Sequence, residues 1–298
     1  MRDVDDLPHV DLRVPDSVAR ILSGLATHGI AIFQGGTERN DLLCVARSLI
    51  SIRAHRDSDF DGVTTIARRP ASKVGRTSLA GFTDRELWPH TEGSAVCRPP
   101  RVLMLACLRP ARTGGRSHLV DGRDLYDEIA RTDPAMLAAL STPRSAYFGG
   151  GSGHLGAVFE QTTEGRMTVR LRLDELARFA PILAPSIDQL RTLVQQLTIP
   201  VDLRAGHGYV LLNDRWLHGR TGFTGNRMML RIIGDPLSTD GLPSGFCPAE
   251  APQRALRAAC SPSTPPHDLA HGLRVHTSAR PALGRTNDAD TGVRKGAP

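Results

Sequence analysis

The sequence predicts a mainly β protein in which one antiparallel sheet system is partly covered by helices. The first part of the chain places amphipathic helical segments between short apolar runs, and the segment from Pro200 to residue 236 has the pattern of strands separated by Gly-containing turns. The longest wholly apolar run covers residues 102–108, far fewer than the roughly 20 residues that a membrane helix needs. These observations favour strands with flanking helices, and no association with a membrane.

The N-terminal part should contain two helices with a buried strand between them. Asp16 and Ser17 are good N-cap residues, apolar residues follow at helical spacing, and Gly29 is a typical helix end. Residues 30–33 are apolar and are followed by two glycines, which predicts a short buried strand. We expect the second helix over residues 37–50.

The central part alternates strands and helices. Prolines bound the apolar run at residues 101–108, which favours a buried strand over a helix. Pro134 interrupts a helical pattern and should start a new helix there. Further strands are expected at residues 117–120 and 167–173, and helices at residues 124–140 and 186–197.

The C-terminal part divides into an all-β segment and a tail. Strands are expected at residues 201–204, 209–212 and 227–233. Residues 251–298 contain no aromatic residue and six prolines, so they can bury little apolar surface. We therefore expect a domain over residues 1–237 and a Pro/Ala/Arg-rich tail over residues 238–298 that is partly disordered.

The net charge of +6 does not indicate a nucleic-acid-binding surface. Only two of the 37 basic residues are lysines, and residues 251–298 carry seven basic and three acidic groups, which accounts for +4 of the total. The rest of the chain is nearly neutral, and aromatic residues make up only 4%. The acidic N-terminus lacks the apolar stretch of a secretory signal. We expect a cytoplasmic protein that binds neither nucleic acid nor membrane.

Two common kinds of site are disfavoured. The five cysteines form no C-x-x-C pair, which excludes a zinc site built on paired cysteines. Residues 151–156 match G-x-G-x-x-G, but the segment before them is a poor strand and a loop-like segment follows soon after them. A glycine-rich loop is a better interpretation than a dinucleotide site.

A histidine two positions before a carboxylate offers a possible metal site. On a strand, residues i and i+2 project to the same face, so both side chains can reach one metal ion. Two histidines and one carboxylate form the facial triad of non-haem Fe(II). The pattern is short enough to arise by chance, so each instance needs context. It occurs at His9-Val-Asp11, His55-Arg-Asp57 and His90-Thr-Glu92.

The third ligand and two anion-binding residues are candidates near the end of the β-rich segment. His218 follows a predicted buried strand, and Arg227 and Arg231 lie on one face of the next strand. Buried arginines are costly unless each meets an anion, and a guanidinium pairs well with a carboxylate. Structural ion pairs are the alternative, for example between Arg231 and Asp214.

These motifs resemble a known family. Their order and the 128 positions between His90 and His218 make the set specific. Together they are similar to the Fe(II)/2-oxoglutarate-dependent oxygenases of the taurine dioxygenase superfamily, over roughly residues 16–235. The His-Thr-Glu form and residues 101–107 most resemble the clavaminate synthase-like branch, which hydroxylates amino acids and their derivatives in natural-product pathways. The motifs are His90-Thr-Glu92, Gly114-Gly-Arg-Ser117, His218-Gly-Arg-x-x-Phe223 and Arg227-x-x-x-Arg231.

The resemblance implies a double-stranded β-helix, or jelly roll, with iron and 2-oxoglutarate sites. His90, Glu92 and His218 would bind Fe(II), Arg227 would pair with the distal carboxylate of 2-oxoglutarate, and Ser117 would help to hold this cosubstrate. The remaining cosubstrate is O2. Because the carboxylate of Glu92 is present, halogenation is disfavoured relative to hydroxylation.

The resemblance also implies a substrate site. Arg231 would face the substrate, and we place Asp214 there as well. We expect a small molecule that is anionic or an amino acid, and we make no prediction about oligomeric state. The same iron centre could instead catalyse desaturation, cyclisation or epoxidation, and a non-catalytic jelly-roll binding protein is the alternative from another class.

Overall fold

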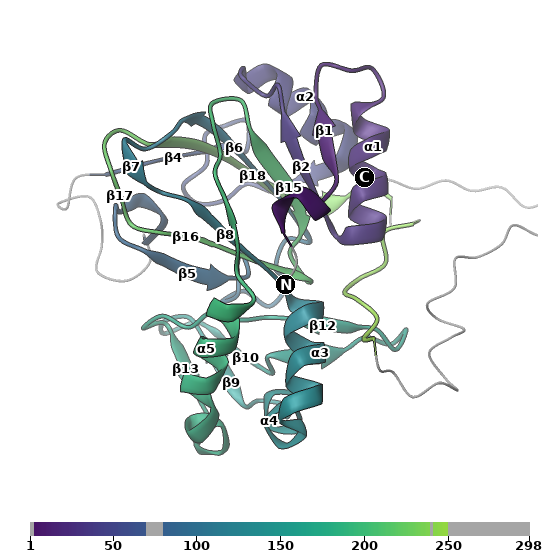
Figure 1. Ribbon diagram of the computed structural model, residues 1–298, viewed down its shortest axis with the longest axis vertical. Coiled ribbons are helices and arrows are strands. Elements are labelled where there is room, and N and C mark those ends of the chain that lie inside the picture. The colour runs from purple at the N-terminus through teal and green to yellow at the C-terminus, as the bar shows by residue number, and fades with distance from the viewer. Residues whose placement is uncertain (1–2, 70–79, 239–240, 250–298) are drawn as a thin grey trace, which may run out of the picture. The chain divides into compact units, whose positions relative to one another are not determined.

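The computed structural model describes residues 3–69, 80–238 and 241–249, which form a double-stranded β-helix with flanking helices (Figure 1). The larger sheet has the order β1-β2-β15-β6-β18-β3, with β4 also paired to β18, and only the β1–β2 pair is parallel. Its strands are β1 His9–Asp11, β2 Ile30–Gln34, β15 Gly208–Leu212, β6 Val102–Arg109, β18 Met228–Pro236, β3 Ile50–Ile52 and β4 Thr64–Ala67.

The smaller sheet provides two candidate metal ligands. It has the order β14-β8-β16-β5, and all of its pairs are antiparallel. Its strands are β14 Ile199–Val201, β8 Ser117–Asp121, β16 Trp216–Arg220 and β5 Leu87–His90. Three short sheets complete the β structure: β10 His154–Gly156, β9 Ala146–Phe148 and β13 Ala177–Phe179; β11 Phe159–Gln161 and β12 Met167–Val169; β17 Phe223–Thr224 and β7 Thr113–Gly114.

The helices cover the outer faces of this sheet system (Figure 1). Helices α1 and α2 pack on the larger sheet through one apolar cluster, and α3, α4 and α5 share a second cluster with the smaller sheet. A third cluster lies between the two sheets and includes Leu105, Tyr209 and Met229. The helices are α1 Ser17–His28, α2 Arg39–Leu49, α3 Gly122–Thr132, α4 Pro134–Leu140 and α5 Ile187–Gln196, with 3-10 turns at Val4–Asp6, Ala80–Phe82 and Pro181–Ser186.

Most elements lie where the sequence places them, and two strands have different bounds. Gly29 ends α1 with φ 72°, a left-handed conformation that glycine adopts readily. Asp133 caps α4 at Met136, and the new helix starts at Pro134 as the sequence predicts. The predicted strand at 167–173 ends at Val169, and the strand predicted at 201–204 lies earlier, at Ile199–Val201.

The folded part continues beyond the predicted boundary at residue 237. Phe246 is fully buried in the cluster under α3 and exchanges both backbone hydrogen bonds with Met167. Arg166 donates to the carbonyl oxygens of Ser244 and Gly245, which fixes this segment further. The expected tail over 238–298 therefore begins too early, since residues 242–247 are part of the domain. The partial disorder predicted for residues 251–298 concerns a segment outside the described residues.

Candidate active site

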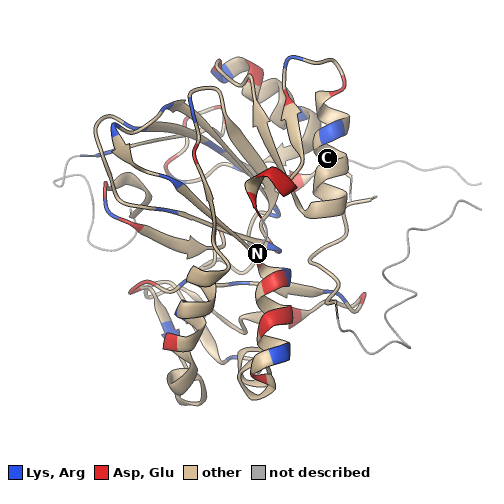
Figure 2. Cartoon of the chain, in the orientation of Figure 1, with Lys and Arg blue, Asp and Glu red and all other residues tan. Residues whose placement is uncertain are grey.

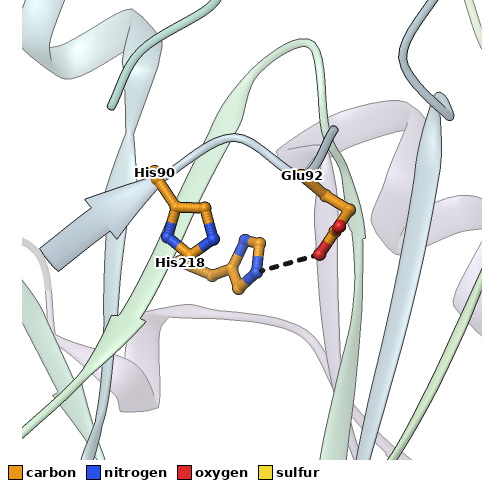
Figure 3. A group of neighbouring side chains, drawn as sticks. All are labelled: His90, Glu92 and His218. Carbon is orange, nitrogen blue, oxygen red and sulfur yellow. Dashed lines mark ion pairs between the residues drawn. The ribbon is translucent and has the colours of Figure 1, made fainter. Parts of the chain in front are cut away.

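The side chains of His90, Glu92 and His218 converge between the two sheets (Figure 3). His90 is the last residue of β5 and lies opposite His218 in the register of β16, so a strand ladder brings the two rings together. Their ring centroids are 4.5 Å apart, and His218 Nε2 is 3.9 Å from Glu92 Oε2. One potential ligand atom from each of the three residues lies within 4.8 Å of the other two.

Glu92 reaches this cluster from a turn, not from a strand. Strand β5 ends at His90, so the expected strand alternation from His90 to Glu92 does not hold. The carboxylate nevertheless points at the two imidazoles (Figure 3). Something other than a strand ladder must therefore fix the position of Glu92.

The protonation states of the three groups suit a divalent metal. Burial lowers the pKa of His90, and burial together with His90 lowers the pKa of His218 to about 3, so both rings are neutral at pH 7. Burial alone would raise the pKa of Glu92, but Arg231 and the neighbouring histidines lower it to about 2. His90 Nδ1 lies 2.9 Å from the Trp88 carbonyl oxygen, and donation to this oxygen leaves the Nε2 lone pair free for a metal.

This set fits a non-haem iron site. Two neutral imidazoles and one carboxylate are the facial-triad donors, which leave coordination positions open for other molecules. The ligand atoms of all three residues lie within 4.8 Å of one another, close enough to bind one metal ion. His90, Glu92 and His218 are therefore the residues that would hold Fe(II).

A small cavity beside the triad contains a buried arginine without an anion. The cavity has a volume of about 50 Å³ and is lined by Glu92, His218 and Arg227, with Tyr209, Arg220 and Arg231. Arg227 is only 7% exposed, and burial lowers its pKa. Its guanidinium has no ion pair or hydrogen bond to any described residue, and its Cζ lies 5.7 Å from the centroid of the Phe223 ring. A buried cation without a partner indicates a site for an anionic ligand.

Ser117 lies close to this region at the start of β8, opposite Arg220. Its hydroxyl and that of Tyr209 are both buried and lie beside each other. Ser117 is not one of the residues lining the small cavity, so its predicted contact with the cosubstrate stays a prediction.

A larger cavity of about 670 Å³ opens on the other side of the triad. His90, Glu92 and Arg231 form part of its wall. Four further arginines, Arg53, Arg56, Arg98 and Arg172, line it together with His55 and the glycine-rich loop at residues 149–152. Its volume lies in the range of small-molecule binding sites.

Arg231 pairs with a metal ligand. Its Nη1 donates to Glu92 Oε2 at 2.8 Å, so the protein carboxylate that meets Arg231 is Glu92 and not Asp214. Its Nε and Nη2 are buried and have no hydrogen-bond partner among the described residues. Arg231 therefore supports Glu92 and still offers donors to a further anion.

Asp214 is not brought to this site. Its Oδ2 accepts from the Ser244 hydroxyl at 2.6 Å and from Arg101 Nε at 3.4 Å, and it lines a separate cavity of about 180 Å³. The substrate-binding role expected for Asp214 therefore receives no support from its position. Its neighbour Asn213, to which the sequence assigned no role, is the residue that faces Glu92.

His55, from another of the three His-x-carboxylate matches, lies in the wall of the larger cavity and not among the three converging ligands. Burial and the charge of Arg231 lower its pKa, so its ring is neutral at pH 7. Its Nδ1 accepts from the Asp57 amide at 3.1 Å, which puts the ring proton on Nε2. The His-x-Asp pattern at residues 55–57 was the available signal. By contrast, His9 lies exposed on β1.

A family comparison decides what kind of protein carries this site. The sequence profile described as taurine catabolism dioxygenase TauD, TfdA family matches residues 3–233. The chain belongs to this family. It is thus an Fe(II)/2-oxoglutarate-dependent dioxygenase, and the family predicted from the motifs is confirmed.

Individual relatives of this TauD-family chain differ in what they act on. It is 26% identical over 257 residues to uridine-5'-phosphate dioxygenase from a Streptomyces species, a match covering 77% of this chain and 91% of that protein. It superposes on an asparagine oxygenase in complex with Fe(II), hydroxyasparagine and succinate with a TM-score of 0.61 and 18% identity, covering 74% and 80% of the two chains.

A second solved structure has the same fold. The non-haem iron oxygenase OrfP, in complex with Fe, succinate and hydroxy-L-Arg, gives a TM-score of 0.56 at 15% identity, covering 75% of this chain and 84% of that chain. At such identities the two superpositions establish the jelly-roll fold alone.

Two further features of the TauD-family chain concern its possible partners. No helix within the described ranges is long and apolar enough to cross a membrane. Basic and acidic residues are mixed on the same elements, for example on α3 (Figure 2).

Proposed function

We propose that this dioxygenase uses 2-oxoglutarate and O2 to hydroxylate an anionic small molecule, with an amino acid or an amino-acid-derived natural-product intermediate as the leading candidate. The observation that supports this most directly is the pair of cationic sites on either side of the triad. Among the described residues, Arg227 in the small cavity has no anionic partner, and Arg231 next to the large cavity has donors that no residue accepts.

The reaction consumes one molecule each of substrate, 2-oxoglutarate and O2, and gives hydroxylated substrate, succinate and CO2. Fe(II) held by His90, Glu92 and His218 would activate O2, whose reduction is coupled to oxidative decarboxylation of 2-oxoglutarate and oxidation of the substrate. Arg227 binds the distal carboxylate of the cosubstrate and so directs its other end toward the triad. Arg231 holds the carboxylate of Glu92 through Nη1 and an anionic group of the substrate through its other nitrogens.

The wall of the larger cavity supports a substrate with a negative charge and hydrogen-bond acceptors. His55 offers a neutral Nε2–H, and Arg98 has no ion pair or hydrogen bond from its side chain to other described residues. The solved structures named above contain hydroxylated asparagine and hydroxylated arginine, which supports an amino-acid substrate.

A second candidate is a phosphorylated nucleoside. The Streptomyces relative is named for uridine 5'-phosphate, and a cavity of about 670 Å³ provides more room than a free amino acid needs. Arg98 and the Arg231 donors that no described residue accepts suit a phosphate as well as a carboxylate. The same iron centre could also catalyse a desaturation, cyclisation or epoxidation.

A substrate screen tests the proposal. The purified protein with Fe(II), ascorbate and 2-oxoglutarate is incubated with amino acids, their derivatives and nucleoside monophosphates, and succinate is measured for each. We expect one anionic class to raise succinate formation well above the substrate-free rate. A product with one added oxygen identifies hydroxylation, whereas loss of two hydrogens identifies desaturation or cyclisation. Stimulation only by neutral or cationic compounds would contradict the anionic substrate.

A further inference from the structure

Glu92 is the one candidate iron ligand that no strand ladder holds. The backbones of His90 and His218 pair directly across β5 and β16. Glu92 lies in the turn after β5, and its backbone N–H and C=O bond to neither strand. Because a facial triad requires three ligands in fixed positions, another group must fix this turn.

The side chain of Asn213 provides this support. Its Oδ1 accepts from the Glu92 backbone N–H at 2.6 Å, and its Nδ2 donates to the Glu92 carbonyl oxygen at 2.9 Å. A further bond runs from Nδ2 to the Pro100 carbonyl oxygen at 2.8 Å. Asn213 is only 2% exposed, so water does not compete for these bonds.

Asn213 is itself held by rigid neighbours. It lies in the turn between β15 and β16, five positions before His218, and its backbone N–H donates to the Arg101 carbonyl oxygen at 2.8 Å. In the same turn, Arg215 makes a two-pronged buried pair with Asp121, at 3.0 and 2.8 Å. The turn that leads into β16 and His218 therefore also holds the backbone of Glu92.

We propose that Asn213 is a positioning residue of the metal site, which sets the place of the Glu92 carboxylate relative to the two histidines. It does not touch the metal, and it acts through the backbone of Glu92. This inference concerns the metal site of the TauD-family enzyme and does not depend on which substrate is used.

Metal binding by variants tests the proposal without relying on turnover. Fe(II) alone is titrated anaerobically into the protein by calorimetry. Loss of a residue that supports a metal ligand lowers affinity by about 10–100-fold, so we expect the Kd of Asn213→Ala to rise by that factor. Asn213→Asp keeps the shape but replaces the Nδ2 donor by an acceptor and should weaken binding similarly.

Two controls separate positioning from a general loss of stability. Met136→Ala removes a buried side chain from α4, so it should lower the melting temperature while leaving the Fe(II) Kd within about twofold. In a Glu92→Ala background, Asn213→Ala should have little further effect on Kd, because the ligand through which it acts is gone. Equal weakening by Met136→Ala, or full additivity with Glu92→Ala, would overturn the proposal.

Amide exchange of the unmodified protein gives an independent check should the Asn213 variants not fold. The Glu92 N–H should exchange slowly because Asn213 holds it in a buried bond. Fast exchange at Glu92 would refute the inference. Failure of the unmodified protein to bind Fe(II) would instead refute the metal site itself, so the two failures can be distinguished.

Discussion

Arg227 is a buried guanidinium that no described carboxylate neutralises. In this it differs from Arg215 and Arg231, which pair with Asp121 and Glu92. Arg227→Ala should raise the KM for 2-oxoglutarate by at least about tenfold, because loss of a charged partner in a buried site costs roughly 2–5 kcal/mol. Arg227→Lys keeps the charge but not the two-pronged geometry, so its KM for 2-oxoglutarate should lie between those of the unmodified protein and Arg227→Ala. An unchanged KM in the alanine variant would mean that another residue binds the distal carboxylate.

Arg231 differs because one of its nitrogens is already used by Glu92. Arg231→Met keeps most of the volume and removes the charge. We expect a rise of about tenfold or more in the substrate KM, on the scale of a lost charged hydrogen bond. Decarboxylation of 2-oxoglutarate without product should persist, since Arg227 is intact. A lower melting temperature with an unchanged substrate KM would show that Arg231 serves only its pair with Glu92.

The two histidine ligands give the most direct test of the metal. His90→Ala or His218→Ala should abolish turnover, because two donors hold Fe(II) much less well than three. Chelation should remove the activity of the unmodified protein, and Fe(II) but not Zn(II) should restore it. Full activity after exhaustive chelation would be incompatible with an iron enzyme.

Among the elements, the close approach of β16 and β5 depends on Gly219. A Cβ at this position would lie 2.5 Å from the Leu87 carbonyl oxygen and 2.7 Å from the Pro89 nitrogen, and both are backbone atoms that cannot rotate away. Only a residue without a side chain lets the two strands pair so that His218 faces His90.

Gly219→Ala should therefore displace β5 and disturb the metal site. We expect an Fe(II) affinity lower by about 10–100-fold, as when the support of a ligand is lost, and a stability loss of about 1–3 kcal/mol from overpacking. Gly151→Ala is a matched control because its Cβ would meet no atom within 4 Å. Equal Fe(II) affinities of the two variants in a calorimetric titration would show that the strand spacing does not matter.

For the whole molecule, the end of the folded domain lies beyond Phe246. Phe246→Ala should lower the free energy of unfolding by about 3–5 kcal/mol, because it empties a fully buried aromatic position.

Removal of residues 251–298 should leave folding and turnover normal, since their composition can bury little apolar surface. Urea unfolding measures the stability of the Phe246→Ala variant and of the truncated protein, and succinate formation measures the turnover of the truncated protein. Loss of activity on removal of 251–298 would show that this segment contributes to the site.

The sequence by itself determined the ligand types, the family and most elements. Strand and helix patterns are local, so α1, β2 and β6 lie close to their predicted places. The order and spacing of the motifs at His90, His218 and Arg227 identify the family, and the structure brings these residues to adjoining cavities.

Only the tertiary structure decided which residues touch. Glu92 meets Arg231, 139 positions away, and Asn213, 121 positions away, and no local pattern encodes pairs so distant in sequence. The same reason explains the misplaced role of Asp214, whose neighbour in the turn faces the metal site instead. The packing of Phe246 beside Met167 is likewise a long-range contact, so composition alone put the domain boundary too early.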